Sequence, residues 1–464
     1  MQNYLEQLIA RAQGFSPLRQ LRVLTVSKRA INRCVTALKK FDVDVIQKMD
    51  TSSLADLPTT TMTVPSGTVS STLDRCVDDL FSSHTDKGRY LEFETKVLTG
   101  IYTEILSRFK EYQSQRRAVL KSQSMLYRTL HQLSDAAGQA GESPKITVPE
   151  EEGQLQVDVV IKMLLVHAEA IGRCYELSST TEVVRNMRAL MKILLDHVYM
   201  QYVDIAVETA LEDLKMSDGK TGDPDLAQLY LLTKCDHIAR LLQMHFETAV
   251  LPLLVNHPAM MRDMLNEKNA LLTQMEAKLN TLMHRQLDVI MNWLGVILGK
   301  QKKTAYNCDD SEIDIMNLNT AVCIQACDFI RKVEKTVTAQ LSHGRNRDIF
   351  LTEVGVSFHA MILDYIKKQT VNATGGLVLS KDITMFQSSV DAFHIRTLNE
   401  RFDMLREVSN LYLVKPEILP SILSEGHLGK LEYKMVVPLL ASRHDWSKIE
   451  RQVKSDMNNV ISST

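Results

Sequence analysis

A short run, Gly219-Lys220-Thr221, is the first place where residue types and spacing could support chemistry. It matches the end of a phosphate-binding loop, in which Gly, four residues and then Gly-Lys-Ser/Thr let backbone N–H groups surround the phosphates. The first glycine is missing, because Leu214 occupies that position inside a predicted helix that follows no strand. We therefore interpret the run as a turn between two helices, and we expect no nucleotide there.

Metal binding would require Cys, His or carboxylate groups at suitable spacings. Cys323 and Cys327 lie four residues apart and share a helix face, but no Cys-x-x-Cys pair or nearby His pair accompanies them. The acidic run at 309–314 lacks the central glycine and the final glutamate of a calcium loop. Because acidic residues are favoured at helix N-termini, we assign the run to the start of the next helix. We predict no metal and no cofactor.

Catalysis by a nucleophile requires a base placed beside it, and neither Gly-x-Ser-x-Gly nor His-Glu-x-x-His occurs in the sequence. His167 and His245 stand in or beside apolar stripes, so we expect them to be packed residues. Asn372-Ala373-Thr374 would be glycosylated only in a secreted protein. The basic pairs 116–117 and 302–303 are interpreted as solvated helix ends, with acidic lipid heads or partners as the alternative. The sequence thus indicates a scaffold without catalytic residues.

The composition favours helices and excludes several classes of protein. Among 464 residues, 18 Gly and 11 Pro provide too few turns for an all-β sandwich or barrel. With 45% hydrophobic residues the chain is not a disordered protein, and 54 Lys and Arg against 56 Asp and Glu exclude a basic nucleic-acid-binding domain. The first 20 residues do not resemble a secretory signal, and the best apolar stretch, 157–166, is too short to span a membrane. The seven cysteines follow no disulfide pattern, so we expect a soluble cytoplasmic protein.

Apolar residues recur every three or four positions through most of the chain, which predicts amphipathic helices. One stripe begins at Leu98 and reaches Phe109, and the longest, from Met260 to Leu294, predicts one helix of over thirty residues. Segments rich in Gly, Pro, Ser or Thr predict loops at 50–71, 134–153, 216–224, 300–312, 342–347 and 370–382. Asp223 or Asp225 is expected to cap the helix after the third loop. We predict helical bundles at 1–133, 155–299 and 312–464, with loops at 134–154 and 300–311.

Several stretches, in the same order and spacing, resemble a known family, the Sec-ten subunit (exocyst complex component five) of the vesicle-tethering exocyst. The similarity is strongest from about residue 225 onward, and the stretches that carry it are Leu229-Tyr-Leu-Leu, His245-Phe-Glu, Leu251-Pro-Leu-Leu, Gln274-Met-Glu-Ala-Lys-Leu-Asn, Gln301-Lys-Lys-Thr, Ala326-Cys-Asp-Phe-Ile-Arg-Lys-Val-Glu-Lys, Glu353-Val-Gly-Val-Ser-Phe-His, Gly375-Gly and Asn410-Leu-Tyr-Leu-Val-Lys-Pro-Glu. The first block is similar more loosely, through Tyr90-Leu-Glu-Phe-Glu.

The resemblance implies an elongated all-α rod of stacked helical bundles that acts as a non-enzymatic scaffold. It implies a role in tethering secretory vesicles to the plasma membrane before fusion. Other exocyst subunits are the expected partners, with small GTPases as further candidates, peripheral membrane association through the complex and no nucleic acid. Family members are longer and begin with a coiled-coil segment, which we expect this chain to lack. We therefore expect the chain to fold alone and to join the complex weakly through its rod surfaces.

Two alternatives stay open at the level of sequence. The first is a helical adaptor of membrane recycling related to fungal F-box proteins, although no F-box is visible before the bundles. The second is an enzyme with an unrecognised helical active site. Identification of the proteins that co-purify with the chain would distinguish both alternatives from a tethering scaffold.

Overall fold

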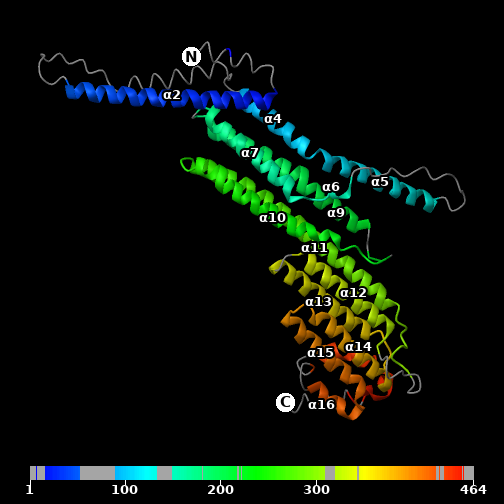
Figure 1. Cartoon of the computed structure of the whole chain (residues 1–464). Coiled ribbons are helices and arrows are strands. Elements are labelled where there is room, and N and C mark those ends of the chain that lie inside the picture. The colour runs from blue at the N-terminus through cyan, green and yellow to red at the C-terminus, as the bar shows by residue number, and fades with distance from the viewer. Residues whose placement is uncertain are drawn as a thin grey trace. The chain divides into compact units, whose positions relative to one another are not determined.

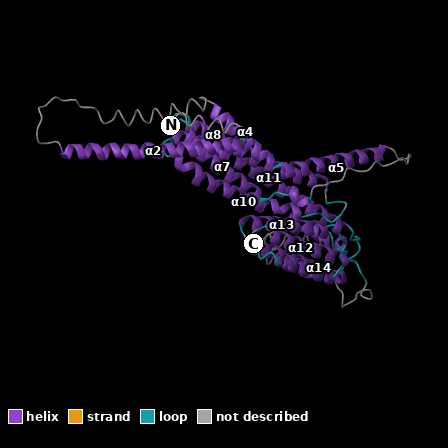
Figure 2. Cartoon of the chain, turned by 45° about the horizontal axis from the view of Figure 1, so that its top comes forward, coloured by secondary structure: helices purple, strands orange, loops and turns teal. Residues whose placement is uncertain are grey.

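Helices dominate the residues that the structure describes, as the apolar spacing predicts. The computed structural model describes residues 16–52, 89–132, 149–179, 181–216, 219–220, 222–308, 319–341, 344–424 and 433–451, together with residues 7, 428 and 453. Within these ranges no β-strand occurs (Figure 2), and isolated backbone bridges join Val371 to Tyr306 and to Arg443. The prediction of an all-α fold is therefore confirmed.

The chain divides into two compact units. Unit 1 comprises Met1–Ala206 and Lys234–Glu276, and unit 2 comprises Val207–Thr233 and Ala277–Thr464. The boundaries fall inside the three helices α9 (Asp204–Met216), α10 (Tyr230–His245) and α11 (Pro258–Gly299). The division into three bundles that the loops suggest remains a prediction.

Unit 1 is organised around α7 (Val157–Leu177), which contacts α2, α4 and α8. Apolar side chains from these helices form its core because each helix buries one stripe: Leu98, Tyr102, Met163 and Leu190 are all fully buried. The stripe that begins at Leu98 is thus confirmed as a core stripe. The other helical segments of unit 1 beside α7 are α2 (Pro17–Ser52), α4 (Arg89–Ile105), α5 (Ser107–Gln132), α6 (Glu150–Gly153), α8 (Val183–Leu195), the π-helical η1 (Asp196–Val203) and η3 (Phe246–Val250), and the short 3₁₀ turn η4 (Leu251–Leu253).

Unit 2 is built on a bundle of four helices, α12 to α15, which lie side by side in Figure 1. Its core contains Phe358 of α13, which packs edge-to-face on Phe386 of α14 at 5.5 Å between ring centroids. The ring of Phe402 of α15 is tilted against that of Phe358, with 6.3 Å between the ring centroids. The helical segments of unit 2 are the 3₁₀ turn η2 (Ala227–Leu229), α12 (Ala321–Gln340), α13 (Arg345–Ile366), α14 (Ala373–Asp391), α15 (Arg396–Leu413), the 3₁₀ turn η6 (Pro416–Ile418), α16 (Leu419–Ser424) and α17 (Tyr433–Leu440).

The predicted loop at 370–382 is wrong, because most of it belongs to α14. Asn372 caps this helix: its side-chain oxygen accepts a hydrogen bond from the backbone N–H of Gly375 at 2.7 Å. The two glycines that suggested a loop serve close packing instead. A Cβ atom on Gly375 would lie 1.6 Å from the carbonyl oxygen of Tyr306, so only glycine permits this approach.

Two further helices bear on the sequence predictions. The 42 residues of α11 confirm the long helix expected over 260–294. Among the described helices, α13 is long and apolar enough to cross a membrane by length and composition alone. Its Phe350, Phe358 and Ile362 are buried in unit 2, and the helix contacts α12 and α15, so α13 serves as a core helix.

Candidate interaction surface

The structure places the phosphate-loop fragment in a packed turn. Gly219 adopts a left-handed conformation with φ of 71°, and a Cβ atom there would lie 2.3 Å from the carbonyl oxygen of Val289 in α11. Lys220 is exposed, and Thr221 lies outside the described residues. Because the backbone of Gly219 faces α11, its surroundings are those of a helix-to-helix turn, as predicted. Asp225 is not the N-cap of the turn that follows, because Leu226 occupies that position without a side-chain cap bond, but the Asp225 carboxylate accepts from the N–H of Ala227 at 2.8 Å.

The cysteine pair is buried in the core of unit 2. Cys323 and Cys327 lie on the inner face of α12, and Cys323 Sγ donates to the carbonyl oxygen of Asp382 at 3.6 Å. A hydrogen bond to Cys327, followed by burial, raises the pKa of the Cys323 thiol, which keeps it neutral. In the described part of the chain, no group of three or more His, Cys, Asp or Glu side chains could hold a metal ion. The acidic run at 309–314 lies outside that part.

Asp382 organises a buried polar cluster that the sequence analysis missed. The side chain is fully buried on α14 and accepts hydrogen bonds from three residues that precede α12. Its oxygens lie 2.8 Å from the Tyr306 hydroxyl, 3.1 Å from the Asn319 amide nitrogen, and 3.0 and 2.7 Å from the backbone nitrogen and hydroxyl of Thr320. Tyr365 adds a hydroxyl 2.9 Å from that of Tyr306. Every bond fixes the segment before α12 to the bundle, so the cluster is structural.

His167 and His245 form a buried pair in unit 1. His167 Nδ1 of α7 lies 2.8 Å from His245 Nε2 of α10, so one neutral ring donates to the other. Burial lowers the pKa of His167 to about 3 and that of His245 to about 4. Both rings are therefore uncharged at neutral pH. The expectation that these histidines are packed residues is confirmed.

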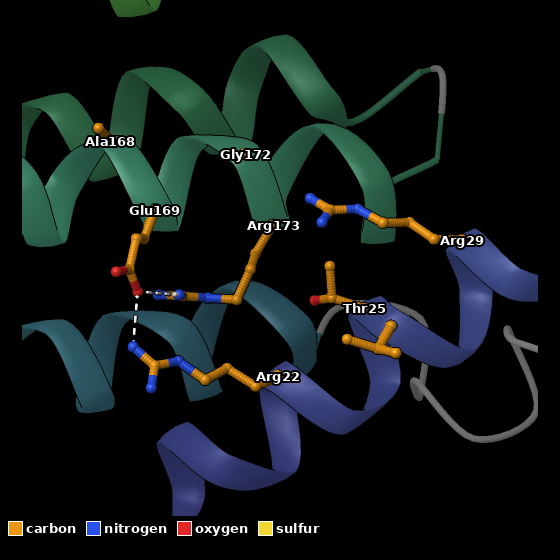
Figure 3. Close-up of a pocket in the computed structure, with 8 residues that line it drawn as sticks. Arg22, Thr25, Arg29, Ala168, Glu169, Gly172 and Arg173 are labelled. Carbon is orange, nitrogen blue, oxygen red and sulfur yellow. Dashed lines mark hydrogen bonds and ion pairs between the residues drawn. The ribbon is translucent and has the colours of Figure 1, made fainter.

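An open groove lies between α2 and α7 of unit 1 (Figure 3). It has a volume of about 460 Å³. Four residues of each helix line it, namely Arg22, Thr25, Val26 and Arg29 of α2 and Ala168, Glu169, Gly172 and Arg173 of α7. The arrangement has no nucleophile beside a base, so it suits binding better than catalysis.

Ion pairs hold the two walls of this α2–α7 groove together. Arg22 lies 2.9 Å from Glu169, and Arg29 lies 2.5 Å from Glu176, about two turns further along both helices. Beneath them, Arg173 pairs with the fully buried Glu94 of α4 at 2.6 Å. The exposed pairs contribute little stability, whereas the buried pair fixes the position of α7 on α4. The groove is thus set on a rigid base.

The sequence analysis did not identify this groove, although one signal was present. Residues 17–40 contain seven Lys or Arg and no Asp or Glu. In a chain whose opposite charges almost balance, such a stretch marks a local basic surface. Which helix lies against it could not be read from the spacing of residues, because that depends on tertiary packing.

Comparisons with known proteins give a consistent result. A family model described as "Exocyst complex component Sec10-like, alpha-helical bundle" matches residues 1–455. Exocyst complex component 5 of Homo sapiens is 25% identical over 377 residues, which cover 81% of this chain and 52% of the human protein. The protein of the same name from Drosophila melanogaster is 26% identical over 386 residues, or 82% and 52%. Exocyst complex component SEC10 of Saccharomyces cerevisiae is 27% identical over 260 residues, or 56% and 30%. The chain spans about half the length of the animal relatives.

Proposed function

Since the chain belongs to the Sec10-like family of exocyst components, we propose that it is a non-enzymatic scaffold subunit of the exocyst. In this role it helps to tether secretory vesicles to the plasma membrane before fusion. The observation that carries the proposal is the family match over residues 1–455, which includes both compact units. The described residues support it further, because their buried polar groups bond one another and fix helices in place.

The partners of such a scaffold are other exocyst subunits, which bind through exposed helix faces. We place the chain in the cytoplasm, with peripheral recruitment to the plasma membrane and to vesicles through the complex. Small GTPases are candidate regulators of that recruitment. A net charge of −2 argues against nucleic acid as a partner, because phosphate neutralisation requires an excess of basic residues.

The test is recovery of partners from cells. The tagged chain is expressed in its own host and purified from extract, and the co-purifying proteins are quantified by mass spectrometry against a tag-only control. We expect the other exocyst subunits to be enriched above the control. Recovery of ubiquitin-ligase subunits in place of exocyst subunits would support the F-box-type adaptor and contradict the proposal. Absence of every exocyst subunit from a folded, soluble preparation would contradict it as well.

A further inference from the structure

Three segments of unit 2 that are far apart in sequence meet in a short ladder of backbone hydrogen bonds. The N–H of Thr370 donates to the carbonyl oxygen of Lys303 at 2.9 Å. The N–H of Val371 donates to the carbonyl oxygen of Ser442 at 2.8 Å, and the carbonyl oxygen of Val371 accepts from the N–H of His444 at 2.8 Å. The ladder therefore holds three segments together, namely 299–308, 365–371 and 441–444.

These three segments concentrate positive charge on one part of the surface. They contain six Lys and Arg residues and no Asp or Glu, in a chain whose opposite charges almost balance. Five of the six are exposed lysines, which we call the lysine cluster, namely Lys300, Lys302, Lys303, Lys367 and Lys368. The sixth is Arg443, which is buried and bonds the carbonyl oxygen of Val414 at 3.1 Å.

The acidic residues that border the segments leave most of this charge uncompensated. Asp445 pairs with the buried Arg443 at 2.8 Å, and Asp364 pairs with Lys367 at 2.9 Å. Among the described residues, no carboxylate pairs with Lys302, Lys303 or Lys368. The acidic run at 309–314, which follows the first segment, lies outside the described residues. The lysine cluster is therefore free to bind an anion from outside the chain.

We propose that the lysine cluster binds the anionic headgroups of a membrane surface. Groups of about four to eight basic residues are typical of contacts with phosphatidylserine and phosphoinositides, because each ammonium group is attracted by the negative surface potential. Trp293 of α11 is half-buried beside the cluster, with Nζ of Lys300 at 5.7 Å from its ring centroid, and tryptophan favours the level of the headgroups. The inference rests on the proposed function in that the chain works at a membrane, and it adds a direct contact to recruitment through the complex.

The residue types favour a lipid surface over an acidic protein partner. Every exposed cation of the cluster is lysine, a hydrated point charge on a flexible stem that can follow mobile headgroups, whereas arginine suits the fixed geometry of a protein carboxylate. The bulky apolar and tyrosine side chains of the three segments are all buried, namely Tyr306, Tyr365, Ile366 and Val371. These segments therefore offer no apolar anchor of the kind that dominates protein interfaces.

Charge reversal at two exposed lysines tests the proposal and spares the fold. The cluster variant combines Lys302→Glu with Lys303→Glu, and the ladder bond to the carbonyl oxygen of residue 303 does not involve its side chain. The matched control combines Lys335→Glu with Arg396→Glu, which makes the same change in net charge at two exposed residues of unit 2 outside the three segments. Circular dichroism should show that both variants unfold at about the temperature of the parent, as surface substitutions do.

The assay is flotation of the purified full-length chain with lipid vesicles in a density gradient. One set of vesicles contains phosphatidylcholine alone, and the other contains phosphatidylcholine mixed with phosphatidylserine. We expect the parent to bind the mixed vesicles and not the neutral ones, and to bind less as salt is raised, because ions screen the attraction. The cluster variant should bind the mixed vesicles at least about tenfold more weakly, whereas the control should stay close to the parent.

Three outcomes would overturn the inference. The first is equal weakening by the cluster variant and the control, which would make net charge the cause. The second is binding of the mixed vesicles that the cluster variant leaves unchanged. The third is failure of the parent to bind the mixed vesicles, and binding of a fluorescein-labelled polyglutamate peptide in that case would assign the cluster to an acidic protein. Because flotation uses the purified chain, its failure does not affect the recovery of exocyst subunits from cells, and the reverse also holds.

Discussion

Replacement of Asp382 by alanine should destabilise unit 2 more than any surface substitution. The carboxylate accepts four hydrogen bonds from Tyr306, Asn319 and Thr320, and it is fully buried. In Asp382→Ala, the N–H of Thr320 and the amide of Asn319 lose their acceptor inside the protein. The Tyr306 hydroxyl keeps Tyr365 as a partner at 2.9 Å, so its loss is smaller.

The expected magnitude follows from these partners. A buried donor that loses its acceptor costs about 1–3 kcal/mol, so the two donors that lose theirs, the N–H of Thr320 and the amide of Asn319, together account for about 2–6 kcal/mol. We therefore expect Asp382→Ala to lower the free energy of unfolding by about 3–5 kcal/mol. Asp382→Asn keeps one accepting oxygen, and the hydroxyls of Tyr306 and Thr320 can rotate to accept from its amide. That variant should lose about 1–2 kcal/mol.

The chain provides its own probe for this measurement. Its two tryptophans, Trp293 and Trp446, both belong to unit 2, so intrinsic fluorescence reports the unfolding of that unit. In urea, a loss of about 3–5 kcal/mol should move the midpoint of unfolding down by roughly 1–3 M. Asp391→Ala is the control, because Asp391 is exposed at the end of the same helix. Its effect should stay within about 0.5 kcal/mol.

Comparison of the variants at Asp382 and Asp391 tests whether the buried polar cluster stabilises unit 2. If Asp382→Ala and Asp391→Ala unfold at the same urea concentration, the cluster contributes nothing beyond the surface and the reasoning is refuted. If Asp382→Asn loses as much free energy of unfolding as Asp382→Ala, then a single accepting oxygen and rotating hydroxyls do not satisfy most of the donors, and the smaller loss expected for Asp382→Asn is refuted.

Three further predictions use thermal or urea unfolding. As pH falls from about 6.5 toward 4, the chain should lose stability by up to about 1.4 kcal/mol per pH unit for each of His167 and His245, because the unfolded rings take up protons that the folded rings, with pKa values of about 3 and about 4, do not. Circular dichroism at several pH values should show a flatter profile when both are replaced by Gln, and an unchanged profile would exclude this pair as the cause. Gly375→Ala should lower the urea midpoint of unit 2 fluorescence by an amount equivalent to about 1–3 kcal/mol or more, since its Cβ would meet a neighbouring carbonyl oxygen. Gly295→Ala on α11, with open space around it, should raise the midpoint slightly, and equal effects of the two would contradict this account. Arg173→Leu should cost about 3–5 kcal/mol, because it leaves its fully buried glutamate partner without a cation. Replacing that glutamate by Leu as well should recover much of the loss in thermal denaturation, and no recovery would point to lost packing of the arginine instead.

Local spacing in the sequence determined much of this fold. Apolar residues at intervals of three or four specify a helix and its buried face, because a helix turn has 3.6 residues. The long helix α11 and the burial of Leu98 and Phe109 were predictable for this reason, since each depends on neighbours within a few residues. The order of motifs over the chain also indicated the family. These features depend on residues close together in the chain or on the order of motifs along it, so both can be read from the sequence.

Tertiary structure decided the features that join distant segments. The glycines at 375–376 predicted a loop by composition, but both lie inside α14, and the close approach of Tyr306, far away in sequence, requires glycine at 375. Asp382 similarly resembles any polar helix residue until Thr320 and Tyr306 are placed against it. The α2–α7 groove arises because two helices far apart in sequence lie together, with the paired residues Arg22 and Glu169 147 positions apart. Spacing along one helix states which face is apolar, and only the packing of helices fixes which face remains open.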